Sequence, residues 1–139
     1  TYSRFQANYI NVNQLHANLN YSKKINNIIN IHINADYFSW DKDVYHKPNL
    51  TLDLSVPINL RDKIKVTPVM TYMSERNVVD SAVSSLNPRI QANVGFYYSY
   101  SKQLSAYFKL NNLTNSKASQ WIGYEEVGFN AVFGVNFSF

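Results

Sequence analysis

Apolar and polar residues alternate with a period of two along most of this 139-residue chain, and no segment keeps a helical period. The clearest stretch is LTLDLSVPINL (50–60), in which every even-numbered position from Leu50 to Leu60 is apolar. Alternation of this kind is typical of strands with one apolar and one polar face. The pattern predicts seven strands. The first ends at residue 21, and the other six span 29–40, 50–60, 64–72, 90–100, 104–111 and 129–139.

The segments between these strands are of two kinds. The short connectors are 22–26, 61–63 and 101–103, and the long ones are 41–49, 73–89 and 114–128. Short and long connectors alternate strictly, as the periplasmic turns and extracellular loops of transmembrane β-barrels do. The last strand would then end at the periplasmic side, which places Phe139 at the inner membrane interface.

Three features favour lipid as the medium around the apolar face. Each apolar face is about 9 to 11 residues tall, as a tilted strand needs to cross the hydrocarbon layer. The polar faces carry Asp36, Asp53, Lys65 and Lys109 among amides and hydroxyls, as a hydrated lumen would. Aromatic residues gather where a membrane interface would lie. They are Tyr21, Tyr98, Tyr100, Phe137 and Phe139 at the short-turn end and Tyr37, Trp40 and Tyr72 at the other.

The predicted fold class is therefore all-β, an antiparallel transmembrane β-barrel. A soluble β-barrel that binds a small ligand in an apolar interior is the alternative, because it produces the same alternation. Barrels of the membrane class have an even number of strands, and unpaired strand edges in lipid are costly. We therefore interpret 1–139 as the C-terminal segment of a larger barrel, completed by missing sequence or by another chain. Residues 1–13 would form the top of the first strand or the loop before it.

Composition adds few constraints. The chain has 11 Tyr, 8 Phe and 2 Trp but only 4 Gly and 4 Pro, which suits strands. It has no cysteine and no apolar run of the roughly 18 residues that a membrane-spanning helix requires, and neither end resembles a signal peptide. The net charge of +4 comes from scattered bases, so nucleic acid is not a predicted partner. Much of the basic excess lies near the short turns, where phospholipid headgroups would be its neighbours.

The last thirty residues, LNNLTNSKASQWIGYEEVGFNAVFGVNFSF (110–139), resemble the C-terminus of TonB-dependent receptors and related outer-membrane barrels of Bacteroidetes-type bacteria. YHKPNLTLDLSV (45–56) is similar to a stretch that follows a long loop in that family. The residues that carry the C-terminal resemblance are Asn112, Leu113, Asn115, Gly123, Tyr124, Gly128, Gly134 and Phe139.

The resemblance implies a location in the bacterial outer membrane and transport of a nutrient across it. It also implies that Gly134, Phe137 and Phe139 belong to the signal that the barrel-assembly machinery reads. The family's plug domain and TonB-contacting segment have no counterpart in these residues, so TonB would be a partner only through a plug outside this sequence. The alternative is a structural or scaffold barrel in a complex with other outer-membrane subunits.

Seven residues are candidates for lining the lumen: His16, His32, Asp36, Asp53, Tyr97, Tyr107 and Lys109. A symmetric turn at 22–26 would set His16 opposite His32, and a turn that pairs Tyr37 with Leu52 would set Asp36 opposite Asp53. Facing carboxylates favour a bound cation. A hydrated lumen wall is the simpler interpretation, so we predict no metal and no cofactor.

Two further sets of residues are candidates for contact with a ligand. A three-residue turn at 101–103 would pair Tyr97 with Tyr107 and Gly95 with Lys109, forming an aromatic ladder on the lumen wall. In the last long loop, Trp121, Tyr124, Glu125 and Glu126 are candidates for contact with something outside the cell. No enzyme is predicted, because Ser39 has the parity of the lipid face whereas His32 and Asp36 have the parity of the lumen face.

Overall fold

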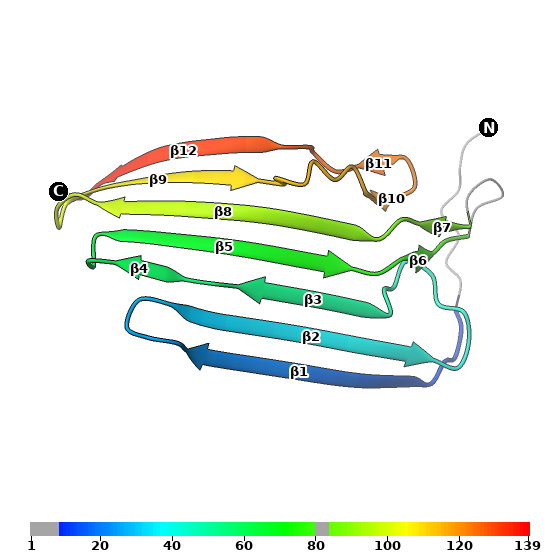
Figure 1. Ribbon diagram of the computed structural model, residues 1–139. Coiled ribbons are helices and arrows are strands. Elements are labelled where there is room, and N and C mark those ends of the chain that lie inside the picture. Colours follow the sequence, from blue (N-terminus) through cyan, green and yellow to red (C-terminus); the bar gives the residue numbers. More distant parts are fainter. Residues whose placement is uncertain (1–8, 80–83) are drawn as a thin grey trace.

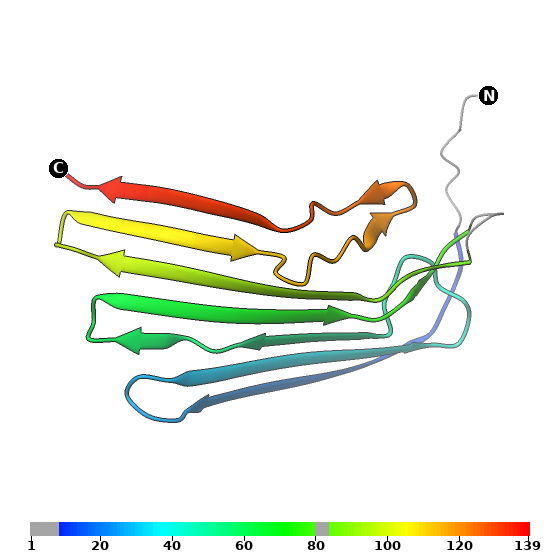
Figure 2. The same cartoon turned by 45° about the horizontal axis from the view of Figure 1, so that its top comes forward.

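The computed structural model describes residues 9–79 and 84–139. In these residues the protein is all-β and antiparallel, and no helix is long and apolar enough to cross a membrane. The main strands lie side by side in one curved sheet, with short turns at one end and long loops at the other (Figure 1). A second view shows the two small hairpins of the long loops at that same end (Figure 2).

The sheet contains the seven predicted strands in chain order. Its strands are β1 (Gln14–Lys24), β2 (Asn30–Trp40), β3 (Leu50–Ser55) with its continuation β4 (Ile58–Leu60), β5 (Ile64–Met73), β8 (Arg89–Ser99), β9 (Leu104–Asn111) and β12 (Asn130–Phe137). The long loops contain two hairpins that were not predicted. These are β6 (Arg76–Asn77) with β7 (Ser85–Leu86), and β10 (Ser119–Trp121) with β11 (Tyr124–Glu125).

The predicted strand 50–60 is divided in two, because β3 ends at Ser55 and β4 begins at Ile58. Both parts pair with β5 in the same register. Ser55 pairs with Val69 and Ile58 with Val66, so no residue is gained or lost across the break. Two prolines cause the interruption, because neither can donate a ladder hydrogen bond. Pro68 accepts from the Val56 N–H at 3.0 Å and Pro57 from the Asn30 N–H at 3.0 Å, and neither returns the bond.

The first hairpin turns later than predicted. β1 continues through Lys24, and the turn lies at residues 25–29, where the Asn26 Oδ1 accepts the N–H groups of Ile28 and Ile29 at 2.8 Å each. This side-chain cap centres the turn three residues further along the chain. As a result, His16 pairs with Phe38 and His32 with Ser22. The prediction that His16 lies opposite His32 is wrong.

The second hairpin also differs from the prediction, by two residues. Tyr37 pairs with Leu50 rather than Leu52, and the ladder extends to the Phe38 N–H, which donates to the Asn49 carbonyl at 2.8 Å. Asp36 therefore faces Thr51, and Asp53 faces Asn34. The prediction that the two carboxylates face each other is wrong.

The predictions for the hairpin of β8 and β9 are confirmed. Tyr97 pairs with Tyr107, and Gly95 pairs with Lys109. The turn follows the expected position at 101–103, because the Tyr100 and Ser101 N–H groups both donate to the Leu104 carbonyl.

Paired residues lie on the same side of a sheet, so the registers define two continuous faces. One face is apolar across all seven strands; one row of it joins Leu54, Met70 and Ala92, and another row joins Phe96, Phe108 and Phe133. The opposite face is mainly polar. Trp40, which was predicted to mark the end of an apolar face, pairs with Gln14 on the polar face instead.

The apolar face has no protein against it among the residues that the structure describes. Leu52, Leu54, Phe108 and Phe133 are 38%, 37%, 39% and 69% exposed, respectively. These side chains would be buried in the soluble-barrel alternative. The sheet also does not close, because β1 and β12 each have a neighbour on one side only.

Candidate functional site

The polar face carries all seven residues predicted to line a lumen, but it does not gather them into one site. Two groups form, one on β1–β3 and one on β5–β9. The first is centred on Asp36, whose carboxylate accepts from Asn18 at 2.8 Å and from Asn34 at 3.0 Å. The His16 Nε2 also lies 2.7 Å from it.

This cluster is a hydrogen-bonded network. The described residues contain no group of three or more His, Cys, Asp or Glu side chains that could hold a metal ion. His32 lies apart from Asp36 in this network and contacts the Ser22 Oγ through its Nδ1 at 2.9 Å. Among the described residues no carboxylate is hydrogen-bonded to His32.

Aromatic rings extend this cluster towards the loop end of the sheet. The His16 ring stacks on Phe38 with centroids 4.4 Å apart, and Phe38 stacks on Trp40 at 5.8 Å. The stack explains the position of Trp40 on the polar face. The Trp40 indole packs against the Phe38 ring on the polar face, so it does not need the apolar face for packing.

The second group forms a groove of about 530 Å³ over β5, β8 and β9. Tyr97 and Tyr107 line it side by side, with Lys65 and Lys109 beside them. The Lys109 Nζ lies 5.6 Å from the centroid of the Tyr107 ring, within the range of a cation–π interaction. This half of the polar face is therefore cationic and aromatic, whereas the β1–β3 half carries the two aspartates.

Gly134 provides space for one of these rings. It pairs with Tyr107, and a Cβ added at Gly134 would overlap the Tyr107 ring. Phe137 and Phe139 lie at the end of the same strand, exposed and with their rings edge-to-face at 5.2 Å. The assembly-signal role of these three residues stays a prediction, and the structure adds a packing reason for a glycine at position 134.

The loop end of the sheet holds the only buried residues of the described chain. We call residues 74–79, 84–88 and 112–129 the loop cap. The cap contains the four residues that are at most 6% exposed, namely Arg76, Val78, Leu86 and Asn112. Arg76 joins its two hairpins, because its Nη1 and Nη2 donate to the carbonyls of Gln120 at 3.2 Å and Ser119 at 2.7 Å. Burial lowers the pKa of Arg76, and the charge of Arg89 lowers it further.

Asparagines of the C-terminal resemblance organise the cap. Asn112 and Asn115 both have left-handed backbones, with φ of 52° and 49°. The Asn112 side chain donates to the carbonyls of Ser116 and Val127 and so closes the base of the last long loop. Asn115 Oδ1 accepts the Phe129 N–H, and a Cβ at Gly128 would lie 2.6 Å from that oxygen. These residues therefore have a structural function in this loop.

The four residues predicted to contact something outside have different environments. Trp121 and Tyr124 are 55% and 73% exposed, and Glu125 is exposed. Trp121 also lies against the His46 ring, with centroids 4.7 Å apart. Glu126 points back onto the polar face, where its carboxylate accepts from Arg89 and Gln91. Their contact with an external ligand stays a prediction.

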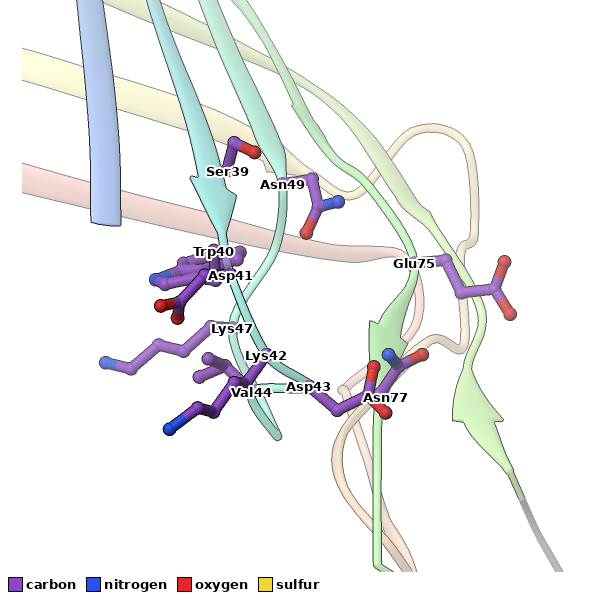
Figure 3. A pocket seen from close by; sticks show the side chains of 10 residues that line it. All are labelled: Ser39, Trp40, Asp41, Lys42, Asp43, Val44, Lys47, Asn49, Glu75 and Asn77. Carbon is purple, nitrogen blue, oxygen red and sulfur yellow. The ribbon is translucent and has the colours of Figure 1, made fainter. Parts of the chain in front are cut away.

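A further pocket of about 540 Å³ lies beside the loop 41–49. Figure 3 shows its charged side chains pointing in several directions instead of converging on one point. Asp41 is engaged with Asn13, whose backbone and side-chain N–H groups donate to the carboxylate and hold the pKa of Asp41 below its usual value. Lys42 donates to the Asn11 carbonyl at 2.8 Å. We assign no chemistry to this pocket.

Sequence reasoning did not identify Arg76, Arg89 or Gln91. Arg76 and Arg89 lie in the segment 73–89, which was predicted only as a long loop, and Gln91 lies in the predicted strand 90–100, where no role was assigned to it. The contacts of Arg76 and Arg89 are 37 to 44 residues away in the sequence. No local pattern signals contacts of that range.

Three solved structures are similar to this chain. A variant of the ferric enterobactin receptor PfeA from Pseudomonas aeruginosa matches with a TM-score of 0.73 over 88% of this chain, at 17% identity. The siderophore receptor PiuA from Acinetobacter baumannii matches with a TM-score of 0.75 over 91%, at 14% identity. The ferric-catecholate import receptor Fiu from Escherichia coli K12 matches with a TM-score of 0.71 over 88%, at 13% identity.

The fold is that of part of a receptor β-barrel. The chain spans about a fifth of the length of these receptors, covering 22%, 22% and 20% of them. No family model matches the sequence. No curated protein matches it either. The predicted fold class is thus confirmed, and the resemblance to TonB-dependent receptors is supported at the level of the fold, while the Bacteroidetes type stays a prediction.

Proposed function

We propose that this chain is part of an outer-membrane β-barrel that transports a nutrient, in a protein similar to TonB-dependent receptors. One observation carries the proposal: an apolar face that no other described residue covers continues across seven strands, with a polar face opposite. Leu52, Phe108 and Phe133 on the apolar face are more than a third exposed. Lipid would cover these side chains, as it does in outer-membrane barrels, while the polar face would line the lumen.

The connectors suggest the orientation in the membrane. The short turns would lie in the periplasm and the loop cap outside, as in other barrels of this class. Phe137 would then lie at the periplasmic interface with Phe139 beyond it. Lys23, Lys24 and Arg61 would lie near the phospholipid headgroups of the inner leaflet.

The two sheet edges suggest how the barrel is completed. β1 and β12 both run from the loop end to the short-turn end of the sheet (Figure 1). If every seam of the barrel is antiparallel, an odd number of further strands must lie between them. Those strands, from the same chain or another, would pair edges that otherwise cost several kcal/mol for each bare backbone group in lipid.

The neighbouring structures suggest which cargo to test first. PfeA is a receptor for ferric enterobactin, and Fiu is an import receptor for ferric catecholates. We propose ferric siderophores as the first class of nutrient to examine, with energy supplied through TonB and a plug that lies outside these residues. Catalysis is not part of the proposal.

Uptake by the source bacterium tests the proposal. The gene for the full-length protein is deleted and restored, and uptake of iron-55 siderophores and of other labelled nutrients is measured with and without an active TonB. We expect deletion to abolish uptake of one nutrient and restoration to recover it. Unchanged uptake of every nutrient, together with loss of a partner from an outer-membrane complex, would favour the scaffold function instead. Recovery of the protein in the soluble fraction without detergent would contradict the membrane location.

A further inference from the structure

A carboxylate of the loop cap is held by two donors on the polar face of the sheet. Glu126 follows β11, and its Oε1 accepts from the Nη1 of Arg89 while its Oε2 accepts from the Nε2 of Gln91 at 2.5 Å. The donors are two residues apart on β8, so they project from the same face of one strand. Each carboxylate oxygen therefore has its own donor, which is how an oxyanion ligand would be bound.

Two arginines lie near this carboxylate, and Glu126 is paired with one of them. Arg76 and Arg89 both act on the site, since the charge of Arg89 lowers the pKa of Arg76 and the charge of Glu126 raises it. Glu126 pairs with only one of them, because the Nη atoms of Arg76 donate to uncharged backbone carbonyls. The Nε atoms of both arginines are buried and have no hydrogen-bond partner among the described residues.

The carboxylate lies at the wall of a pocket. A pocket of about 510 Å³ is lined by Gln91, Glu125 and Glu126 together with the aromatic rings of Trp121 and Tyr124. Arg89 does not line this pocket, but its guanidinium is paired with Glu126, which does. The side chains of Arg89 and Glu126 are 24% and 15% exposed, so the pair is largely but not completely shielded from water.

We propose that Arg89 and Gln91 form an oxyanion-binding site, that Glu126 occupies it as an internal ligand, and that a small aromatic carboxylate displaces Glu126. The carboxylate of the ligand takes the place of the Glu126 carboxylate between the two donors. Its ring lies against the exposed faces of Trp121 and Tyr124. Displacement frees the segment from Tyr124 to Val127, while Arg76 continues to hold β10 through Ser119 and Gln120.

An internal ligand lowers the apparent affinity for an external one by the fraction of time that the site is free. If Glu126 occupies the site about nine-tenths of the time, removal of its carboxylate strengthens binding about tenfold. Glu126→Gln keeps the shape of the side chain and removes the charge, and Glu126→Ala opens the path to Arg89. Both variants should bind the external carboxylate more tightly than the native protein.

The probe is 4-fluorobenzoate, titrated into the full-length protein in detergent and followed by fluorine NMR. We expect both Glu126 variants to bind it about tenfold more tightly than the native protein. Adding Arg89→Gln to Glu126→Ala should abolish the gain. The matched neutral probe is 4-fluorobenzamide, for which the Glu126 variants should show no gain. Heat-dependent mobility on gels confirms that each variant is folded as a barrel.

Hydrogen exchange provides a second measurement on the native protein. Saturating 4-fluorobenzoate should raise exchange in residues 124–127 and leave the amides of β8 protected. Equal affinity of the native and Glu126 variants for the benzoate would overturn the proposal, as would an equal gain for the benzamide. Because binding is measured directly, these outcomes are independent of whether the barrel transports a nutrient.

Discussion

The sheet and the loop cap are stabilised in different ways, although both consist of antiparallel hairpins. The cap holds all four buried residues of the described chain, and two of them, Arg76 and Asn112, are polar. In the sheet, large apolar side chains such as Phe133 are exposed to whatever surrounds the protein. The apolar side chains of the sheet are therefore buried only if the surrounding medium covers them, whereas the cap buries residues within its own structure.

The difference extends to hydrogen bonding. Backbone ladders hold the strands of the sheet together, and these bonds join main-chain groups rather than side chains. In the cap, side chains do this work, because Asn112 and Asn115 bind backbone groups of the last loop and Arg76 binds carbonyls of β10. Single substitutions should consequently affect the cap locally and the sheet mainly through its apolar face.

The largest effect is expected from a charge placed on the apolar face. Met70 is on that face near the middle of β5, and Val69 is its neighbour on the polar face. Met70→Arg should destabilise the full-length protein in lipid vesicles by about 2–4 kcal/mol, because the guanidinium would lie in hydrocarbon. Denaturant unfolding of the vesicle-bound protein measures the change.

Val69→Arg is the matched control for that substitution. Its side chain would enter the polar face one residue away, and the cost should be less than about 1 kcal/mol. Similar costs for the two variants would contradict the assignment of the apolar face to lipid.

A smaller and more local effect is expected in the cap. Arg76→Gln removes the donors to the Ser119 and Gln120 carbonyls, and losing the hydrogen bonds of a charged group costs about 2 kcal/mol. Hydrogen exchange should accelerate in β10, β11, β6 and β7 while the amides of β5 and β8 stay protected. Lys102→Gln, at an exposed short turn, removes a charge elsewhere and should leave the cap unchanged. Faster exchange throughout the sheet would show that the two regions are not separate.

The smallest effect is expected at the close contact between β9 and β12. Gly134→Ala should cost about 1 kcal/mol, because the new methyl group displaces the Tyr107 ring. Gly95→Ala is the control, since the nearest atom to its added Cβ is 4.0 Å away, and it should change stability by less than about 0.5 kcal/mol.

Removing the ring tests the reason for that cost. In the Tyr107→Ala background, Gly134→Ala should become nearly neutral, and denaturant unfolding of the four proteins gives the coupling between the two positions. An unchanged cost in that background would mean that Gly134 is needed for something other than the ring.

The sequence by itself determined which side chains share a face. Alternation is a local property, because successive side chains of a strand point to opposite sides whatever the strand pairs with. The seven strands, the two faces and the pairing of Tyr97 with Tyr107 could therefore be predicted. The short and long connectors could be predicted as well, since turn residues interrupt the alternation.

Only the tertiary structure decided the registers of the first two hairpins and the contacts of the cap. The register of a hairpin depends on where its turn closes. In the first hairpin the Asn26 side chain caps the turn, and the alternation of apolar and polar residues does not indicate this cap. The partners of Arg76 and Glu126 lie 35 to 44 residues away. Such contacts arise because two loops reach the same end of the sheet, and residue spacing along one strand carries no information about them.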